Sequence, residues 1–108
     1  MLNDPAYVEM ALAFADRILT ESESPGGRAD HAFRLALGRA ATAKELLVVE
    51  ELIRNRQTHY QNNQEATKAL LNNPKFVYKP KHENKIELAT WFNLANALLN
   101  LDETMTRN

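Results

Sequence analysis

The chain has 108 residues and a formal net charge of −1 at pH 7, with 25% charged and 44% hydrophobic residues. This length suits one domain with its own core, and the near-neutral charge gives no general attraction to nucleic acid or to an anionic membrane. The absence of cysteine excludes disulfides, thiolate chemistry and cysteine metal sites. No apolar run approaches the roughly 20 residues that span a bilayer. Only three glycines and four prolines interrupt a composition that favours helices.

A phrase that begins with Leu-Asn occurs three times, at residues 2–8, 71–77 and 99–105. Asparagine accepts left-handed backbone angles, and its side chain bonds to nearby amides. Leu-Asn is therefore typical of the end of a helix and the turn after it. We expect helix boundaries at all three places.

The first helix should begin at Asn3 or Asp4, because Pro5 fits the first turn, where its missing N–H costs no hydrogen bond. Two adjacent rows at helical spacing predict its buried face. These rows consist of Tyr7, Val8, Ala11, Leu12, Phe14, Ala15, Ile18 and Leu19. The side chains expected on its outer face are Glu9, Asp16, Arg17 and Glu21.

The segment Ser22–Arg28 is rich in Ser, Gly and Pro and predicts a loop, followed by a short helix over Asp30–Leu37. Gly38 lies where glycine accepts the left-handed conformation that ends a helix. Thr42 and Glu45 have the spacing of a capping box, in which the hydroxyl and the carboxylate each accept a bond from the other residue's N–H. We expect the third helix to begin there.

The third helix is predicted to carry a buried stripe and then a polar run, Arg54–Gln64, that is exposed or projects from the bundle. The stripe consists of Leu46, Val49, Leu52, Ile53 and Tyr60. Capping spacing at residues 62–65 predicts a break or kink near Asn62. After the break, the residues expected to return to the core are Ala66, Ala69, Leu70 and Leu71.

Pro74 prevents further helix, so Lys75–Glu83 is predicted to be an extended loop. Its expected anchors are Phe76, Val77 and Tyr78. The last helix should open at Asn84, and it is apolar on most sides, including Trp91 and Phe92. A helix of this kind belongs at the centre of a bundle. We therefore expect an all-α, single-domain bundle of four main helices, the third of which the predicted break can split.

Two surfaces are candidates for binding. One is the loop, where lysines alternate with aromatic residues, a pattern that can neutralise and stack a polyanion. Its candidate residues are Lys75, Tyr78, Lys79, Lys81 and Lys85. The other is the polar run of the third helix, with Arg54, Arg56 and His59. For both surfaces the ordinary alternative is a solvated face: lysines in water on a loop held by its aromatic residues, and a helix that extends into solvent.

We predict no catalytic, cofactor or metal site. The three histidines, His31, His59 and His82, lack the three or four converging ligands that zinc needs. Acidic residues that share the third helix are typical of a solvated face. A DNA-reading helix-turn-helix around Gly38 is disfavoured, because residues 28–56 contain six basic and four acidic residues, too small an excess for phosphate-driven binding. Nucleic acid is therefore not the expected partner.

Four motifs and the opening Leu-Asn-Asp-Pro together resemble a known family. The motifs are residues 33–39 (FRLALGR), residues 42–46 (TAKEL), Trp91 with residues 95–103 (ANALLNLDE), and residues 106–107 (TR). In these the chain resembles the C-terminal domain of unknown function of planctomycete cytochrome-c-like proteins. It departs from the family at Thr104, where the family usually has an aromatic residue, and residues 54–85 match only loosely.

The resemblance implies that the chain is the C-terminal helical part of a larger, exported protein, periplasmic or extracellular, that can carry a haem c domain upstream. It supplies no catalytic residue, and the haem-attachment motif is absent because there is no cysteine. Our first hypothesis is a non-catalytic interaction or structural module that binds other domains of the parent or another protein. The second is an accessory domain of an enzyme or redox assembly whose reactive groups lie upstream. A third is polyanion or nucleic-acid binding by the 75–85 loop.

Overall fold

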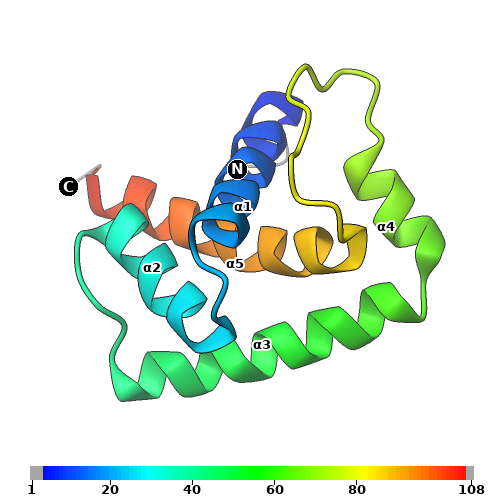
Figure 1. The fold of residues 1–108 in the computed structure, drawn as a ribbon. Helices are drawn as coiled ribbons and strands as arrows, with labels where there is room; N and C mark the ends of the chain where they lie inside the picture. The colour runs from blue at the N-terminus through cyan, green and yellow to red at the C-terminus, as the bar shows by residue number, and fades with distance from the viewer. Residues whose placement is uncertain (1–3, 107–108) are drawn as a thin grey trace.

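The computed structural model describes residues 4–106, with side chains for residues 4–24 and 26–101. The described chain contains no strand and forms five helices: α1 (Pro5–Glu21), α2 (Pro25–Leu37), α3 (Ala43–Gln61), α4 (Gln64–Leu71) and α5 (Lys85–Thr106). Figure 1 shows α5 crossing the middle of the molecule, with α1 and α3 on opposite sides of it. Helix α5 contacts all four other helices and is the centre of the bundle, as predicted.

Helix α1 begins where the sequence predicts. The Asp4 Oδ1 atom accepts a hydrogen bond from the Ala6 N–H at 2.8 Å, and Pro5 occupies the first helical turn. The fully buried apolar side chains belong to the predicted face: Ala11, Leu12, Ala15, Ile18 and Leu19. Asp16 was predicted on the outer face, and this is wrong, because its side chain is buried with 1% of its surface exposed.

Helix α2 begins earlier than predicted. Ser24 caps its start by accepting a hydrogen bond from the Gly27 N–H at 3.4 Å, and Pro25 lies in the first turn. The predicted loop Ser22–Arg28 is therefore half as long as expected, since its second half is the first turn of the helix. The other end matches the prediction, because Gly38 ends α2 in the left-handed conformation with φ of 71°.

The predicted capping box opens α3. The Glu45 N–H donates to Thr42 Oγ1 at 3.2 Å, and the Thr42 N–H donates to Glu45 Oε1 at 2.8 Å. The predicted break lies at Asn62, and Asn63 then caps α4 by accepting from the Ala66 N–H at 3.1 Å. Because this break divides the predicted third helix completely, the described fold has five helices instead of four.

The Leu-Asn phrases mark boundaries less regularly than predicted. The middle phrase coincides with the end of α4 at Leu71, whereas the first begins outside the described residues. The last phrase lies inside α5, which continues to Thr106, so the boundary predicted there is wrong. The Asn100 side chain donates to the Asn96 carbonyl one turn earlier at 2.7 Å. The asparagine is thus satisfied within the helix and does not end it.

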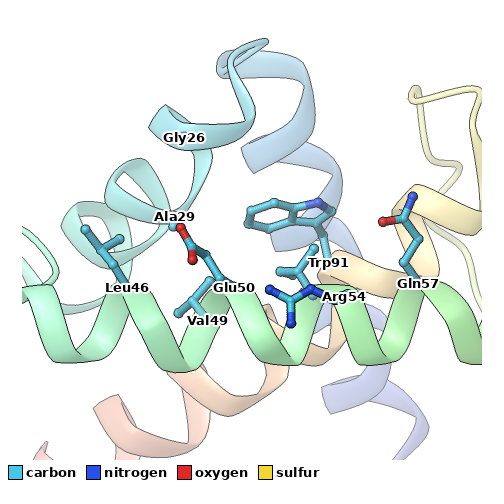
Figure 2. A pocket seen from close by; sticks show the side chains of 9 residues that line it. Gly26, Ala29, Leu46, Val49, Glu50, Arg54, Gln57 and Trp91 are labelled. Atoms are coloured by element: carbon cyan, nitrogen blue, oxygen red, sulfur yellow. The ribbon is translucent and has the colours of Figure 1, made fainter.

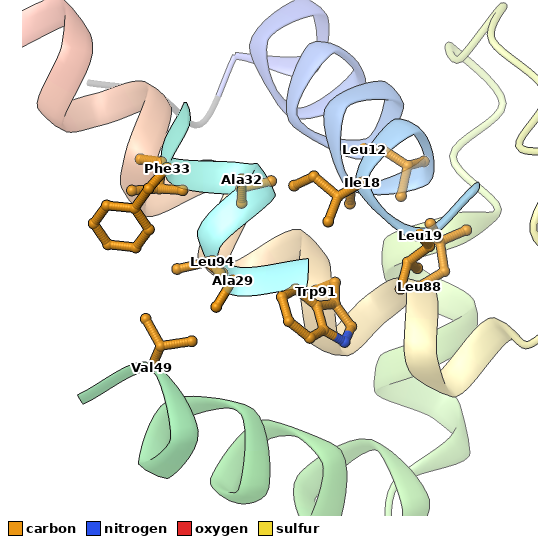
Figure 3. Close-up of a cluster of buried hydrophobic side chains, with 13 residues drawn as sticks. Leu12, Ile18, Leu19, Ala29, Ala32, Phe33, Val49, Leu88, Trp91 and Leu94 are labelled. Carbon is orange, nitrogen blue, oxygen red and sulfur yellow. The ribbon is translucent and has the colours of Figure 1, made fainter. Parts of the chain in front are cut away.

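The core lies where α5 meets α1, α2 and α3 (Figure 3). Its buried side chains are Leu12, Ala15, Ile18, Leu19, Ala29, Ala32, Phe33, Val49, Leu88, Trp91, Leu94, Ala95 and Leu98. Trp91 is 5% exposed, whereas Phe92 is only partly buried. Trp91 is therefore the aromatic side chain of α5 that fills the centre.

Helices α3 and α4 bury less than predicted. Only Val49 and Tyr60 of the stripe are fully buried, while the polar run is mostly exposed, as expected. In α4, Leu71 packs against the core but Ala69 is exposed, contrary to prediction. The one fully buried side chain described in α4 is Thr67, whose hydroxyl donates to the carbonyl of Tyr60 at 3.3 Å.

Residues 72–84 join α4 to α5 without a helix or strand, and Asn84 caps α5 by accepting from the Glu87 N–H at 3.0 Å. Of the predicted anchors, Phe76 packs against the core. Val77 is not an anchor, because it is 84% exposed. Among the described helices, none combines the length and the apolar character that crossing a membrane requires.

Candidate functional site

The loop of residues 72–84 is attached to α1 through the buried carboxylate of Asp16. Its Oδ1 atom accepts from the His82 N–H at 2.8 Å, and its Oδ2 atom accepts from the Lys81 N–H at 3.0 Å and from the Tyr78 hydroxyl. Burial alone would raise the pKa of Asp16, but these hydrogen bonds outweigh it and hold the pKa below its usual value. Burial and the same carboxylate raise the pKa of Tyr78 to about 12.

A second carboxylate of α1 holds the same loop. Glu9 Oε2 accepts hydrogen bonds from the backbone N–H groups of both Val77 and Tyr78. Together Glu9 and Asp16 accept hydrogen bonds from four backbone N–H groups of this loop. Because the loop has no helix or strand to pair its N–H groups, the two carboxylates supply the acceptors. Helical periodicity could not reveal this role, because the partners lie 65 to 69 residues further along the chain.

The candidate residues of the lysine-rich loop lie on this attached segment. Tyr78 directs its hydroxyl to Asp16, while all four lysines are exposed. Tyr78, Lys79 and Lys85 line a common cavity of about 410 Å³ between the loop and α5. Lys75 and Lys81 are not among its lining residues.

The candidate residues of the polar run do not form one site. Arg56 donates to Asn55 Oδ1 at 2.7 Å, and the ring of His59 stands edge-on to that of Tyr60 with centroids 5.0 Å apart. Arg54 instead faces a cleft between α3 and its neighbours.

We call this space the α3 cleft, and it consists of two adjoining cavities. The outer cavity has a volume of about 550 Å³ and is lined by Gly26, Ala29, Leu46, Val49, Glu50, Ile53, Arg54, Gln57 and Trp91 (Figure 2). The inner cavity has a volume of about 210 Å³ and is lined by Arg28, Ile53, Gln57, Glu87, Thr90 and Trp91. The two cavities share Ile53, Gln57 and Trp91.

The outer cavity exists because the start of α2 carries small residues. Gly26 and Ala29 face α3 across the cavity, and a Cβ atom placed on Gly26 would meet nothing within 4 Å. Figure 2 shows the Trp91 ring in the space between the two helices, with Glu50 extending from α3 toward α2. Larger side chains at the start of α2 would fill this volume, so the outer cavity depends on the small residues Gly26 and Ala29.

The inner cavity is bounded by a polar cluster that sequence reasoning missed. Arg28, 8% exposed, donates through Nη1 to Glu87 Oε2 at 3.0 Å and through Nε to the Ser22 carbonyl at 2.7 Å. The other oxygen of Glu87 lies 2.5 Å from Nε2 of His82. Arg28 had been assigned to a loop, and no local pattern indicates a partner 59 residues away.

A third surface is an apolar groove between α3 and α5 with a volume of about 290 Å³. Its apolar lining includes Phe33, Leu52, Leu98 and Leu101. Beside it, Glu45 forms a two-pronged ion pair with Arg39 at 2.8 and 2.9 Å. Hydrogen bonds from Arg39 and from the Thr42 N–H lower the pKa of Glu45 to about 2.

The described residues contain no group of three or more His, Asp or Glu side chains arranged to hold a metal ion. Comparisons with family models, with curated proteins and with solved structures found no match to this chain. The geometry of the chain itself is therefore the basis for any functional proposal.

Proposed function

We propose that this domain is a non-catalytic interaction module of a larger protein, and that it binds a segment of a partner protein in the α3 cleft. The partner is another domain of the parent or a separate protein. The resemblance seen in the sequence implies that the parent is an exported, cytochrome-c-associated protein, and a non-catalytic module of such a parent is part of this proposal. The supporting observation is a pair of opposite charges at the cleft that have no partner within the described chain.

These charges are Glu50 and Arg54, which line the outer cavity one helical turn apart. Side chains at this spacing commonly pair on a helix surface. Here both are exposed, and neither forms an ion pair with another described residue. Both charges therefore remain available to a partner.

The walls between these charges are apolar. Leu46, Val49, Ile53 and the indole of Trp91 line the outer cavity, whose volume is within the range of ordinary ligand pockets. The occupant that fits is a peptide segment with a large apolar side chain that enters toward Trp91. Flanking groups of this segment would carry a positive charge for Glu50 and a negative charge for Arg54.

The test is selection of random 12-residue peptides displayed on phage against the intact domain, followed by affinity measurements on the selected peptides. We expect an apolar residue flanked by one basic and one acidic residue. Gly26→Leu should fill the outer cavity without a clash and weaken binding at least about tenfold. Lys79→Gln, on the opposite loop, is the control and should leave binding unchanged. Equal binding to Gly26→Leu, or failure to select any peptide, would overturn the proposal.

The same cleft supports a second proposal, in which the domain is an accessory part of an enzyme or redox assembly whose reactive groups lie upstream. The cleft is open on one side, and an upstream domain could complete it. Two observations would favour this alternative. One is a Cys-x-x-Cys-His motif in the parent reading frame, and the other is a loss of solvent exposure of Glu50 and Arg54 when the upstream domain is present.

A third proposal is polyanion binding by the lysine-rich loop. It is supported by the four exposed lysines on a backbone that Glu9 and Asp16 hold in place. The probe is heparin in a filter-binding assay at low and moderate salt. A variant with Gln at Lys75, Lys79, Lys81 and Lys85 should lose salt-sensitive binding and keep its melting temperature. Binding that is independent of salt would exclude this loop.

A further inference from the structure

The loop of residues 72–84 and the start of α5 border a cavity of about 410 Å³, which we call the loop cavity. Every second side chain of the loop lines it, an alternation typical of extended backbone: Pro74, Phe76, Tyr78, Pro80 and His82. Lys79 of the loop and Lys85 and Leu88 of α5 also line it. Its volume lies within the range of ordinary ligand pockets.

The side-chain charges that line the loop cavity have one sign. They belong to Lys79 and Lys85, and no Asp or Glu is among the described residues that line it. Glu83, the one acidic residue of the loop, is exposed and lies outside the lining. Both lysines are exposed, and neither forms an ion pair with a described side chain. The cavity therefore carries two positive charges without a contacting counter-charge.

The acidic residues that contact the loop are engaged by other groups. Glu9 and Asp16 accept hydrogen bonds from N–H groups of the loop. Glu87 forms an ion pair with Arg28 at 3.0 Å, and its other oxygen contacts the ring of His82. None of these three acids lines the loop cavity. A contacting counter-charge for the two lysines therefore has to come from outside the described chain.

The wall that carries these groups is held in place by the fold. Four N–H groups of the loop donate to the two carboxylates of α1. Where the loop begins, the Lys75 N–H donates to Asn73 Oδ1 at 2.9 Å. A ligand that enters the cavity does not have to order this backbone, which lowers the entropic cost of binding.

Charge and surface together select the ligand. A phosphate monoester carries nearly two negative charges at neutral pH and balances both lysines, whereas a carboxylate balances only one. Lysine binds phosphate as a point charge, without the paired geometry that arginine provides. The cavity also has apolar walls from Leu71, Phe76 and Leu88, which favour an apolar group attached to the phosphate.

We propose that the loop cavity binds a small phosphate monoester with an apolar body, its phosphate contacting Lys79 and Lys85 and its body packed against Phe76. This site is separate from the α3 cleft and does not depend on peptide binding there. It also differs from polyanion binding along the loop, which uses all four lysines, because Lys75 and Lys81 do not line the cavity.

The probe is phenyl phosphate, titrated into the intact domain at neutral pH and low salt and followed by two-dimensional proton–nitrogen NMR. We expect saturable shifts of the backbone signals of Tyr78, Lys79 and Lys85, and no shift of Gln57 in the α3 cleft. Benzoate, with one charge, should bind about three- to fivefold more weakly, because it loses one exposed ion pair. Failure of phenyl phosphate to shift these signals, or equal binding by benzoate, would overturn the proposal.

Two further compounds test the two halves of the ligand. Inorganic phosphate has no apolar body, and benzyl alcohol has no charge. Each should bind at least about tenfold more weakly than phenyl phosphate. Equal binding by either compound would contradict the proposal, because it would show that the charge alone or the apolar walls alone account for the affinity.

Matched lysine variants separate the cavity from general attraction to the loop. Lys79→Gln and Lys85→Gln should each weaken binding of phenyl phosphate about three- to fivefold, and the double variant about tenfold or more. Lys75→Gln and Lys81→Gln remove the same charge outside the cavity and should leave the affinity nearly unchanged. All four side chains are exposed, so the melting temperature should not change. Equal losses in all four variants would overturn the proposal, and if one cavity variant fails to fold, the other supplies the comparison.

Discussion

The two sides of α5 are built differently. On one side α1 packs closely, and the carboxylates of Glu9 and Asp16 tie the loop of residues 72–84 over it. On the other side α3 lies across α5 and leaves the α3 cleft and the apolar groove. The carboxylates of the closed side are used within the fold, whereas Glu50 and Arg54 on the open side form no ion pair with another described residue. This difference directs the search for a partner to α3.

The largest contrast should come from matched leucine truncations on the two sides. Leu12 of α1 is completely buried in the core, so Leu12→Ala should reduce the free energy of unfolding by about 3–4 kcal/mol. Leu46 is only partly buried beside an existing cavity, and Leu46→Ala should cost about 1–2 kcal/mol. Urea unfolding measures both values. Equal costs would show that the two sides are packed alike and would remove the contrast.

A second contrast concerns the two carboxylates that hold the loop. Asp16 accepts bonds on both oxygens, so Asp16→Asn places an amide donor against backbone donors and should cost about 2–3 kcal/mol. Glu9 accepts both of its bonds on one oxygen, which Gln can supply, so Glu9→Gln should cost less than about 1 kcal/mol. Thermal unfolding of both variants compares them. A large loss for Glu9→Gln would mean that its charge, more than its geometry, holds the loop.

On the open side, the capping box at the start of α3 can be weakened alone. Thr42→Ala removes the acceptor of the Glu45 N–H and should lower stability by about 1 kcal/mol. Gly38→Ala should cost a similar amount, because φ of 71° strains a residue with a Cβ atom. Chemical unfolding measures both. If Gly38→Ala is neutral in stability yet abolishes peptide binding, the turn after α2 belongs to the binding site.

The smallest effect should be the pH dependence of the closed side. The folded pKa of Asp16 is lowered, so its contribution is present above about pH 4, the unfolded pKa, and is lost as pH falls further. The folded pKa of Tyr78 is raised to about 12, so its contribution is complete below about pH 10 and is lost as pH rises through about 12. Tyr78→Phe should remove the alkaline loss and the tyrosine absorbance change near pH 12. An alkaline loss that persists in this variant would have another origin.

Signals that act within a few residues predicted much of the fold. Short-range capping chemistry explains the helix boundaries that were predicted correctly. They are the caps at Asp4 and Asn84, the end of α2 at Gly38, the capping box of Thr42 and Glu45, and the break at Asn62. The start of α2 could have been predicted on the same basis, because Ser24 followed by Pro25 is an N-terminal signature. The glycines after it directed the interpretation toward a loop.

The candidate site was less predictable, because its contacts join distant parts of the chain. The sequence predicted Asp16 on the outer face of a helix and Arg28 in a loop. Both are buried, and each has a partner 59 or more residues away. The outer cavity also joins residues that are far apart in the sequence, because Gly26 and Trp91 line one space only after α2 and α5 have packed. Of the eight candidate binding residues, Arg54 was placed at the α3 cleft, a space that the sequence did not indicate.

The central position of α5 also has a consequence for the order of folding. Most contacts between helices involve α5, which is the last helix in the chain, and the contacts among α1 to α4 are few. During synthesis residues 4–84 of this domain therefore emerge before the side chains of α5 that complete their core, and α1 must close a long loop to reach its main partner. Until residues 85–98 leave the ribosome, Leu12 and Ile18 stay exposed to other chains, which makes the nascent domain a candidate client for chaperones.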